Sequence, residues 1–165
     1  MTTVNHHADH PGFAGVVGLL AGLSMIPGRG AVARLVADSA PVMLRLARAL
    51  TRQRAGITWA EGSAEDLRQP EASATVLWCV ATVHHWKDVS MGLAEARRVL
   101  APEGRLLVIE RCVHPRATGL ASHGWTEQQV QSFAAQCRAA GFDDVRVEQH
   151  TPGRRALYVV RAVRR

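Results

Sequence analysis

Two short apolar runs with an amphipathic helix pattern between them constrain the fold of this chain most strongly. Residues 74–80 read ATVLWCV and residues 106–109 read LLVI. Runs of this kind, rich in aliphatic and β-branched side chains, are typical of strands buried on both faces of a parallel sheet. Apolar residues recur at helical spacing over residues 89–100, and Asp88 can cap that helix. The sequence therefore predicts a strand–helix–strand unit.

The remaining elements extend this alternation. Thr126 and Gln129 form a capping-box pattern for a helix over 126–140, and Gly141 suits its C-terminal end. Pro102-Glu103-Gly104 indicates a turn. Further candidates are a helix over 39–50 and strands at 57–60, 145–147 and 156–163. Strands that alternate with helices and then close with two strands predict an α/β sheet, mostly parallel with an antiparallel edge.

Length and composition suit one soluble globular core. The chain has 165 residues, 47% of them hydrophobic and 21% charged. Its longest uncharged apolar stretch, residues 13–26, is too short to span a bilayer and contains three glycines. The N-terminus lacks a basic start followed by an apolar signal core. We therefore expect a cytoplasmic protein with no membrane span.

Cysteine and charge patterns argue against two classes of partner. The three cysteines are far apart and form no Cys-x-x-Cys pair, so the sequence predicts buried thiols and no metal site. The tail histidines His6, His7 and His10 are potential ligands, but a loose tail does not pre-arrange them. The net charge of +6 comes mostly from scattered arginines with few aromatics among them. A nucleic-acid partner is therefore not favoured.

An ordered series of short motifs over residues 61–110 carries a family resemblance. The motifs are EGSAEDL at 61–67, ATVLW at 74–78, VHHW at 83–86, LAEARRVL at 93–100, APEG at 101–104 and RLLVIE at 105–110. In this order and spacing they resemble the later half of class I S-adenosylmethionine-dependent methyltransferases, of the small-molecule type seen in quinone and lipid biosynthesis. The likeness covers roughly residues 38–163. It implies a Rossmann-like sheet, S-adenosylmethionine as cofactor and a small-molecule acceptor.

The resemblance also implies where cofactor and substrate lie. In open α/β sheets ligands bind beyond the carboxyl ends of the strands. Gly62, Ser63 and Ala64 match the stretch that touches adenine, although an aspartate is usual at position 63. Cys79, Val80 and Ala81 match the stretch that runs past the sulfonium. The segment around His84 and His85 edges the substrate pocket, with Trp86 as a pocket wall or core residue and Glu110 at the same sheet edge.

Two roles stay open for the histidines. Imidazole titrates near neutrality, so His84 or His85 is a candidate catalytic base for a hydroxyl acceptor. The alternative is that one histidine caps the loop by hydrogen bonding and the other faces solvent. Glu110 either lines the substrate side or pairs with an arginine.

The N-terminal part departs from the family pattern. Class I methyltransferases open with an apolar strand and a glycine-rich loop, and the only candidate loop here is Pro27-Gly28-Arg29-Gly30. Asp38 is the ribose-binding acid if residues 32–37 form a strand, or a helix residue if they do not. We therefore expect an incomplete sheet, with an N-terminal segment over 1–38 and a methyltransferase-like α/β domain over 39–165.

Three functions follow from these expectations. The first is a methyltransferase by descent with a reduced cofactor site. The second is a catalytically inactive relative that acts as a partner subunit, in a homo-oligomer or with an intact homologue whose sheet it completes. The third, an anion- or nucleic-acid-binding protein, has little support. Because a missing strand leaves backbone groups unpaired, we expect the isolated chain to self-associate or to need a partner.

Overall fold

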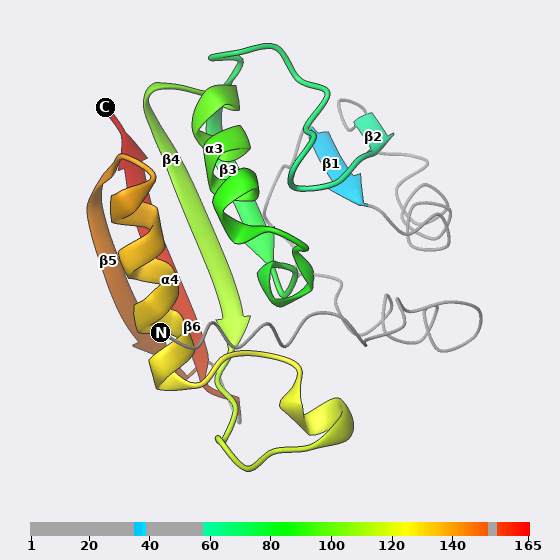
Figure 1. Ribbon diagram of the computed structural model, residues 1–165, viewed down its shortest axis with the longest axis vertical. Coiled ribbons are helices and arrows are strands. Elements are labelled where there is room, and N and C mark those ends of the chain that lie inside the picture. The colour runs from blue at the N-terminus through cyan, green and yellow to red at the C-terminus, as the bar shows by residue number, and fades with distance from the viewer. Residues whose placement is uncertain (1–34, 39–57, 152–154) are drawn as a thin grey trace. The chain divides into compact units, whose positions relative to one another are not determined.

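The computed structural model describes residues 35–38, 58–151 and 155–165 (Figure 1). The chain divides into two units, Met1–Ser63 and Ala64–Arg165. The predicted helix over 39–50, the apolar stretch 13–26 and the candidate loop 27–30 lie outside the described residues. No described helix has the length and hydropathy to cross a membrane.

The first unit contains a pair of short parallel strands. Strand β1 (Leu35–Asp38) pairs with β2 (Thr58–Glu61), and Asp38 lies opposite Glu61 in the register. β2 confirms the strand predicted at 57–60, shifted by one residue. Of the two alternatives for the run before Asp38, the structure has the strand. Both acidic residues therefore stand at the carboxyl ends of parallel strands.

The second unit is built on a four-stranded sheet with the order β3-β4-β6-β5. The strands are β3 (Ala74–Val80), β4 (Leu100–Arg111), β5 (Phe142–His150) and β6 (Leu157–Arg164). β3 and β4 are parallel, whereas β4, β6 and β5 pair antiparallel. The predicted α/β sheet with an antiparallel edge is confirmed, and β3 has the predicted bounds.

The predicted turn at Pro102-Gly104 interrupts the pairing of β4 without ending the strand. Ala74 lies opposite Leu100, but Val76 lies opposite Arg105, so the intervening residues leave the register. Within that stretch Glu103 takes a left-handed backbone with φ 62°. The turn-forming residues therefore shift the pairing register inside a twelve-residue strand.

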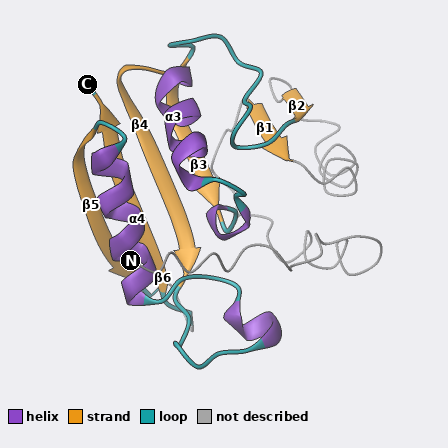
Figure 2. Cartoon of the chain, viewed as in Figure 1, coloured by secondary structure: helices purple, strands orange, loops and turns teal. Residues whose placement is uncertain are grey.

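Two capped helices lie on the same face of this sheet (Figure 2). Helix α3 (Val89–Val99) begins where Asp88 accepts a hydrogen bond from the Met91 amide, as predicted. Helix α4 (Glu127–Ala139) has the predicted capping box between Thr126 and Gln129. Gly141, with φ 82°, follows its end. Local signals thus fix both helix starts.

The core lies between these helices and the sheet. Leu93 and Ala96 of α3, and Val130 and Phe133 of α4, are buried against the strands. The sheet contributes buried side chains from β3, β4 and β6: Cys79, Leu106, Val108, Val160 and Ala162.

The expectation that 74–80 is buried on both faces is wrong. Val76, Trp78 and Val80 are 47%, 48% and 38% exposed, whereas Cys79 is buried in the core. Alternate side chains of a strand point to opposite faces. Among the described residues β3 pairs only with β4, and α3 and α4 cover the face of Cys79. The face of Trp78 is therefore open in the structure described.

Candidate functional site

The candidate site begins with a sharp turn at the carboxyl end of β3. Ala81 has φ 51°, an uncommon backbone for a residue with a side chain, and its amide donates to the carbonyl of Ile109 over 2.8 Å. A short 3-10 helix, η1 (Val83–His85), follows at once. The turn therefore brings the two adjacent histidines to the end of β4, where Glu110 stands.

Glu110 is the one charged side chain buried within the described residues, with 1% exposure. Its Oε1 accepts from the Val83 amide and its Oε2 contacts Nδ1 of His84, both over 2.9 Å. A buried carboxylate is costly unless it is paired in this way. Among the described residues, the side-chain partner of Glu110 is therefore His84 and not an arginine, and its position on the substrate side stays a prediction.

The pairing with Glu110 determines which nitrogen of His84 is available. A carboxylate accepts, so Nδ1 carries the proton and donates, which leaves the lone pair of the neutral ring on Nε2. Nε2 of His84 is buried and has no hydrogen-bond partner among the described residues. The site therefore presents one oriented imidazole nitrogen for which no described residue supplies a hydrogen bond.

A third histidine, His123, completes a cluster with His84 and His85. The ring centroid of His123 lies 5.7 Å from that of His84 and 5.6 Å from that of His85, and the two adjacent rings are 3.9 Å apart. One nitrogen from each ring lies within 4.8 Å of the others. His85 is exposed, and His123 is half-buried. The sequence analysis missed His123 because it is distant along the chain and carries no motif.

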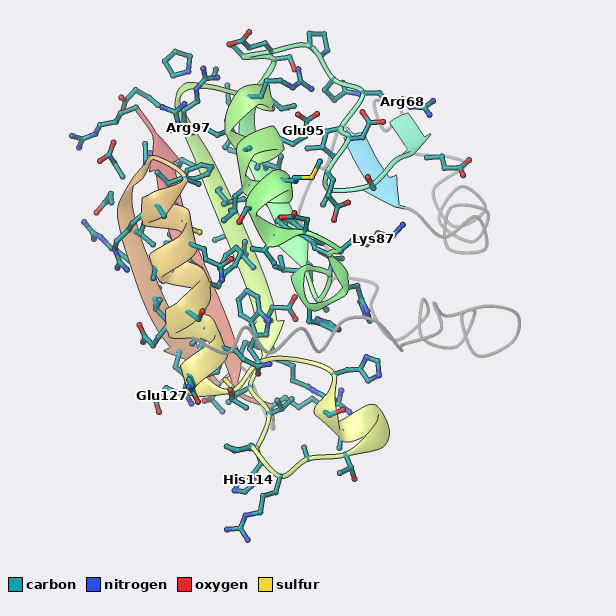
Figure 3. All side chains as sticks on the ribbon, in the orientation of Figure 1. Arg68, Lys87, Glu95, Arg97, His114 and Glu127 are labelled. Carbon is teal, nitrogen blue, oxygen red and sulfur yellow. The ribbon has the colours of Figure 1, made fainter. Side chains whose placement is uncertain are left out.

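His123 is placed by a loop that is closed at its base. The Trp125 amide donates to the carbonyl of Arg111 over 2.8 Å, and the Val113 amide donates to that of Trp125 over 2.9 Å. Gly124 has φ 141°, and a Cβ there would clash with the backbone oxygen of Arg111. His114 stands at the outer end of the same loop, away from the sheet (Figure 3). The base of the loop therefore fixes His123 near the end of β4.

The segment after β2 is held by α3. Oε1 of Glu95 accepts from the Leu67 amide over 2.9 Å, and Arg98 donates to the Leu67 carbonyl over 2.9 Å. The hydrogen bond from Arg98 lowers the pKa of Glu95. Glu65 accepts from the amides of Lys87 and Asp88, just before the helix. Figure 3 shows Glu95 on α3 and Lys87 ahead of it. These contacts fix the backbone that follows Ala64.

The other predicted site residues fall into two groups. Asp38, Gly62 and Ser63 belong to the first unit, whereas Ala64 and Cys79–Ala81 belong to the second. Burial, and then the charge of Glu110, raises the pKa of Cys79 to about 12, so this thiol stays protonated. Trp86 is 8% exposed and packs on Phe133, with ring centroids 6.5 Å apart, so it is a core residue.

Sequence comparison connects this arrangement with a known family. A sequence model described as a methyltransferase domain matches residues 18–108, more than half of the chain. The chain belongs to the methyltransferase domain family. The match begins upstream of residue 38, where the motif resemblance starts, and ends before Glu110 and His123. It therefore covers η1 but not the whole histidine cluster.

One curated relative is a demethylmenaquinone methyltransferase of Deinococcus radiodurans. It is 41% identical over 88 residues, which are 50% of this chain and 34% of that protein. The chain spans about a third of the length of the curated relatives it matches. The class I S-adenosylmethionine-dependent methyltransferase assignment is thus confirmed at the level of the family.

Two solved structures show the same fold. A SAM-dependent methyltransferase from Aquifex aeolicus has a TM-score of 0.64 at 18% identity, covering 79% of this chain and 68% of that one. A Haemonchus contortus phosphoethanolamine N-methyltransferase 2, in complex with S-adenosylhomocysteine, has a TM-score of 0.62 at 16% identity, covering 79% and 43%. At these identities the likeness establishes the Rossmann-like methyltransferase fold.

Proposed function

We propose that this protein transfers a methyl group from S-adenosylmethionine to a hydroxyl of a small-molecule acceptor. The observation that carries this proposal is the contact between buried Glu110 and half-buried His84 at the carboxyl end of β3 and β4, in a chain of the methyltransferase family. Ligands of open α/β sheets bind at this end. A base oriented by a buried carboxylate is an arrangement that serves proton removal.

The residues available for the cofactor suit its chemistry in part. A carboxylate at position 38, the last residue of a strand that pairs in parallel with the next one, is suited to accept ribose hydroxyls. Ala64 is partly buried against the core, and Ala81 turns the backbone at the end of β3, where we expect the sulfonium. Serine at position 63, where the family usually has aspartate, weakens the adenine contact. We therefore propose a cofactor site that is reduced relative to the family.

The proposed mechanism assigns one proton transfer to the chain. When bound, S-adenosylmethionine supplies an electrophilic methyl group on sulfur. His84 holds its Nδ1 proton against Glu110 and accepts the acceptor's hydroxyl proton at Nε2. Glu110 then stabilises the imidazolium charge, and the deprotonated acceptor oxygen would take up the methyl group that S-adenosylmethionine supplies, with S-adenosylhomocysteine as the leaving group. Positioning of the acceptor oxygen against the methyl group would supply most of the remaining acceleration.

Removing the base tests the mechanism. We expect His84→Ala to lower turnover about a hundredfold or more, the usual contribution of a general base, with little change in affinity for S-adenosylhomocysteine. His114→Ala, on the outer end of the neighbouring loop, is the matched control and should keep full turnover. Full turnover of the His84 variant on a hydroxyl acceptor would leave this histidine structural.

Cofactor binding is tested separately by calorimetry with S-adenosylhomocysteine. We expect Ser63→Asp to tighten binding by up to about 1–2 kcal/mol, the scale of a hydrogen bond to a charged group. Asp38→Asn should weaken it. An unchanged dissociation constant in both variants would contradict the proposed placement of adenine and ribose.

The open face of β3 favours a second candidate function, that of a partner subunit. Val76, Trp78 and Val80 form an exposed apolar row on a strand with one described neighbour. We propose that another chain, a second copy or an intact homologue, covers this row. A protein that binds no S-adenosylhomocysteine but sediments as an oligomer would favour this candidate over the enzyme.

A further inference from the structure

The geometry points to a divalent transition-metal site, of the kind that binds Zn²⁺, formed by His84, His85 and His123. We infer that one imidazole nitrogen from each residue binds the ion and that a fourth position stays open to water. The inference does not rest on methyl transfer, because metal binding is measured without cofactor or acceptor. It also departs from the sequence-based expectation of no metal site, which depended on cysteine spacing.

The first argument is the donor set. Three candidate nitrogens lie within 4.8 Å of one another. In a tetrahedral site with bonds of 2.0–2.1 Å, ligand atoms stand roughly 3.3 Å apart, so the rings must close by somewhat more than an ångström. His85 is exposed and His123 half-buried, so an ion can approach the cluster from solvent. Three neutral imidazoles with one open position suit Zn²⁺ and its neighbours in the transition series.

The second argument is the orphan nitrogen. A buried polar atom normally has a hydrogen-bond partner, and Nε2 of His84 has none among the described residues. A bound cation would satisfy this lone pair. Since Nδ1 of the same ring is held by Glu110, Nε2 is the deprotonated nitrogen that a metal requires.

The third argument is the buried carboxylate behind the cluster. Histidines that bind metals usually donate their other ring N–H to a carboxylate or a carbonyl, which fixes the ring orientation and raises its basicity. Glu110 makes this contact with His84 over 2.9 Å and is itself anchored by the Val83 amide. His84 is therefore a fixed anchor onto which His85 and His123 can close.

Metal binding and base catalysis exclude each other at this nitrogen. An ion on Nε2 of His84 occupies the lone pair that would accept the acceptor's proton. Zn²⁺ should therefore inhibit any methyl transfer that uses His84 as the base, and chelator should restore it. This effect is absent if the metal binds elsewhere.

The test is a calorimetric titration of the full, untagged chain with Zn²⁺. Because His6, His7 and His10 offer a competing set in the N-terminal tail, the reference protein carries alanine at these three positions. We expect this reference to bind one ion per chain. In that background, His84→Ala and His123→Ala should each weaken binding by more than about tenfold, whereas His114→Ala should not.

Two further measurements keep the result decisive. Glu110→Gln should weaken Zn²⁺ binding by about 10–100-fold while leaving three ligands in place. Should thermal melts show that the Glu110 or His84 variant fails to fold, the His123→Ala variant decides alone. Co²⁺ in place of Zn²⁺ should give the strong visible absorption of a four-coordinate ion. Binding that disappears with the tail histidines, or that is equal in the His123 and His114 variants, would overturn the proposal.

Discussion

The two faces of the four-stranded sheet differ in how far their apolar side chains are buried. On one face, α3 and α4 bury Cys79 together with Leu93 and Phe133. On the other face, Val76, Trp78 and Val80 of the same strand stay exposed. Both sets consist of apolar side chains, so hydrophobicity alone does not determine burial. What differs is the presence of a covering element among the described residues.

The largest expected difference between the faces is in thiol reactivity. Burial raises the pKa of Cys79 from about 9 to about 12, and that of Cys137 likewise, so about a thousandfold less thiolate is present near neutral pH. A cysteine introduced by Val76→Cys should be alkylated at least about a thousandfold faster than Cys79. Site-resolved mass spectrometry of alkylated protein measures both rates in one sample. Equal rates would mean that the face of Val76 is covered in solution or that Cys79 is open.

The next difference is in stability. Leu93 is fully buried on the covered face, so Leu93→Ala should cost about 2–5 kcal/mol of unfolding free energy through lost burial and a residual cavity. Val76→Ala, on the open face, should cost less than about 1 kcal/mol. Denaturant unfolding of both variants gives the comparison. A large loss in the Val76 variant would show that something packs on the open face.

A smaller effect concerns association through the open face. If another copy covers this face, Trp78→Ser should weaken self-association by about tenfold or more, because a buried tryptophan commonly contributes over 1 kcal/mol at an interface. Met91→Ser is the matched control, since Met91 is an exposed apolar residue on α3. Sedimentation at micromolar concentration distinguishes the two variants. A compact, stable monomer in the wild type would contradict the self-association expected from the sequence.

The smallest expected effect concerns the ion pair between Glu95 and Arg98 on α3. The Arg98 hydrogen bond lowers the pKa of Glu95, so this contact stabilises the folded state above the carboxyl's ordinary pKa. Its contribution is lost as the pH falls through the lowered folded pKa. Glu95→Gln should lower the melting temperature by about 1–3 °C at pH 7, and the difference should vanish in acid. A difference that is independent of pH would assign the effect to packing.

Local signals in the sequence predicted most of the elements. The bounds of β3, the Asp88 cap and the Thr126–Gln129 capping box depend on residues within a few positions of one another, and all three are as predicted. The predicted burial of β3 on both faces was wrong. An apolar run indicates a tendency to be buried, but it does not indicate which elements cover each face of the strand. The strand before Asp38 was ambiguous because a short apolar run fits a helix equally well.

The candidate site was predictable only where it follows strand ends. His84 and Glu110 were both expected at one edge of the sheet, because the carboxyl ends of parallel strands meet there. Their direct contact depends on the left-handed turn at Ala81, a position where the sequence has no glycine to suggest it. His123 reaches the cluster through a long-range loop closure, and no local pattern marks such a closure.

The closed base of the 112–125 loop separates the outer part of this loop from the histidine cluster mechanically. Paired backbone bonds join Arg111 and Val113 to Trp125, so the chain re-enters the fold at the place where it left. Residues inserted or deleted near His114 lengthen or shorten the excursion without shifting its two ends, and each doubling of a flexible loop costs only about 0.6 kcal/mol in entropy. The same base that fixes His123 thus leaves the outer segment free to vary in length and composition.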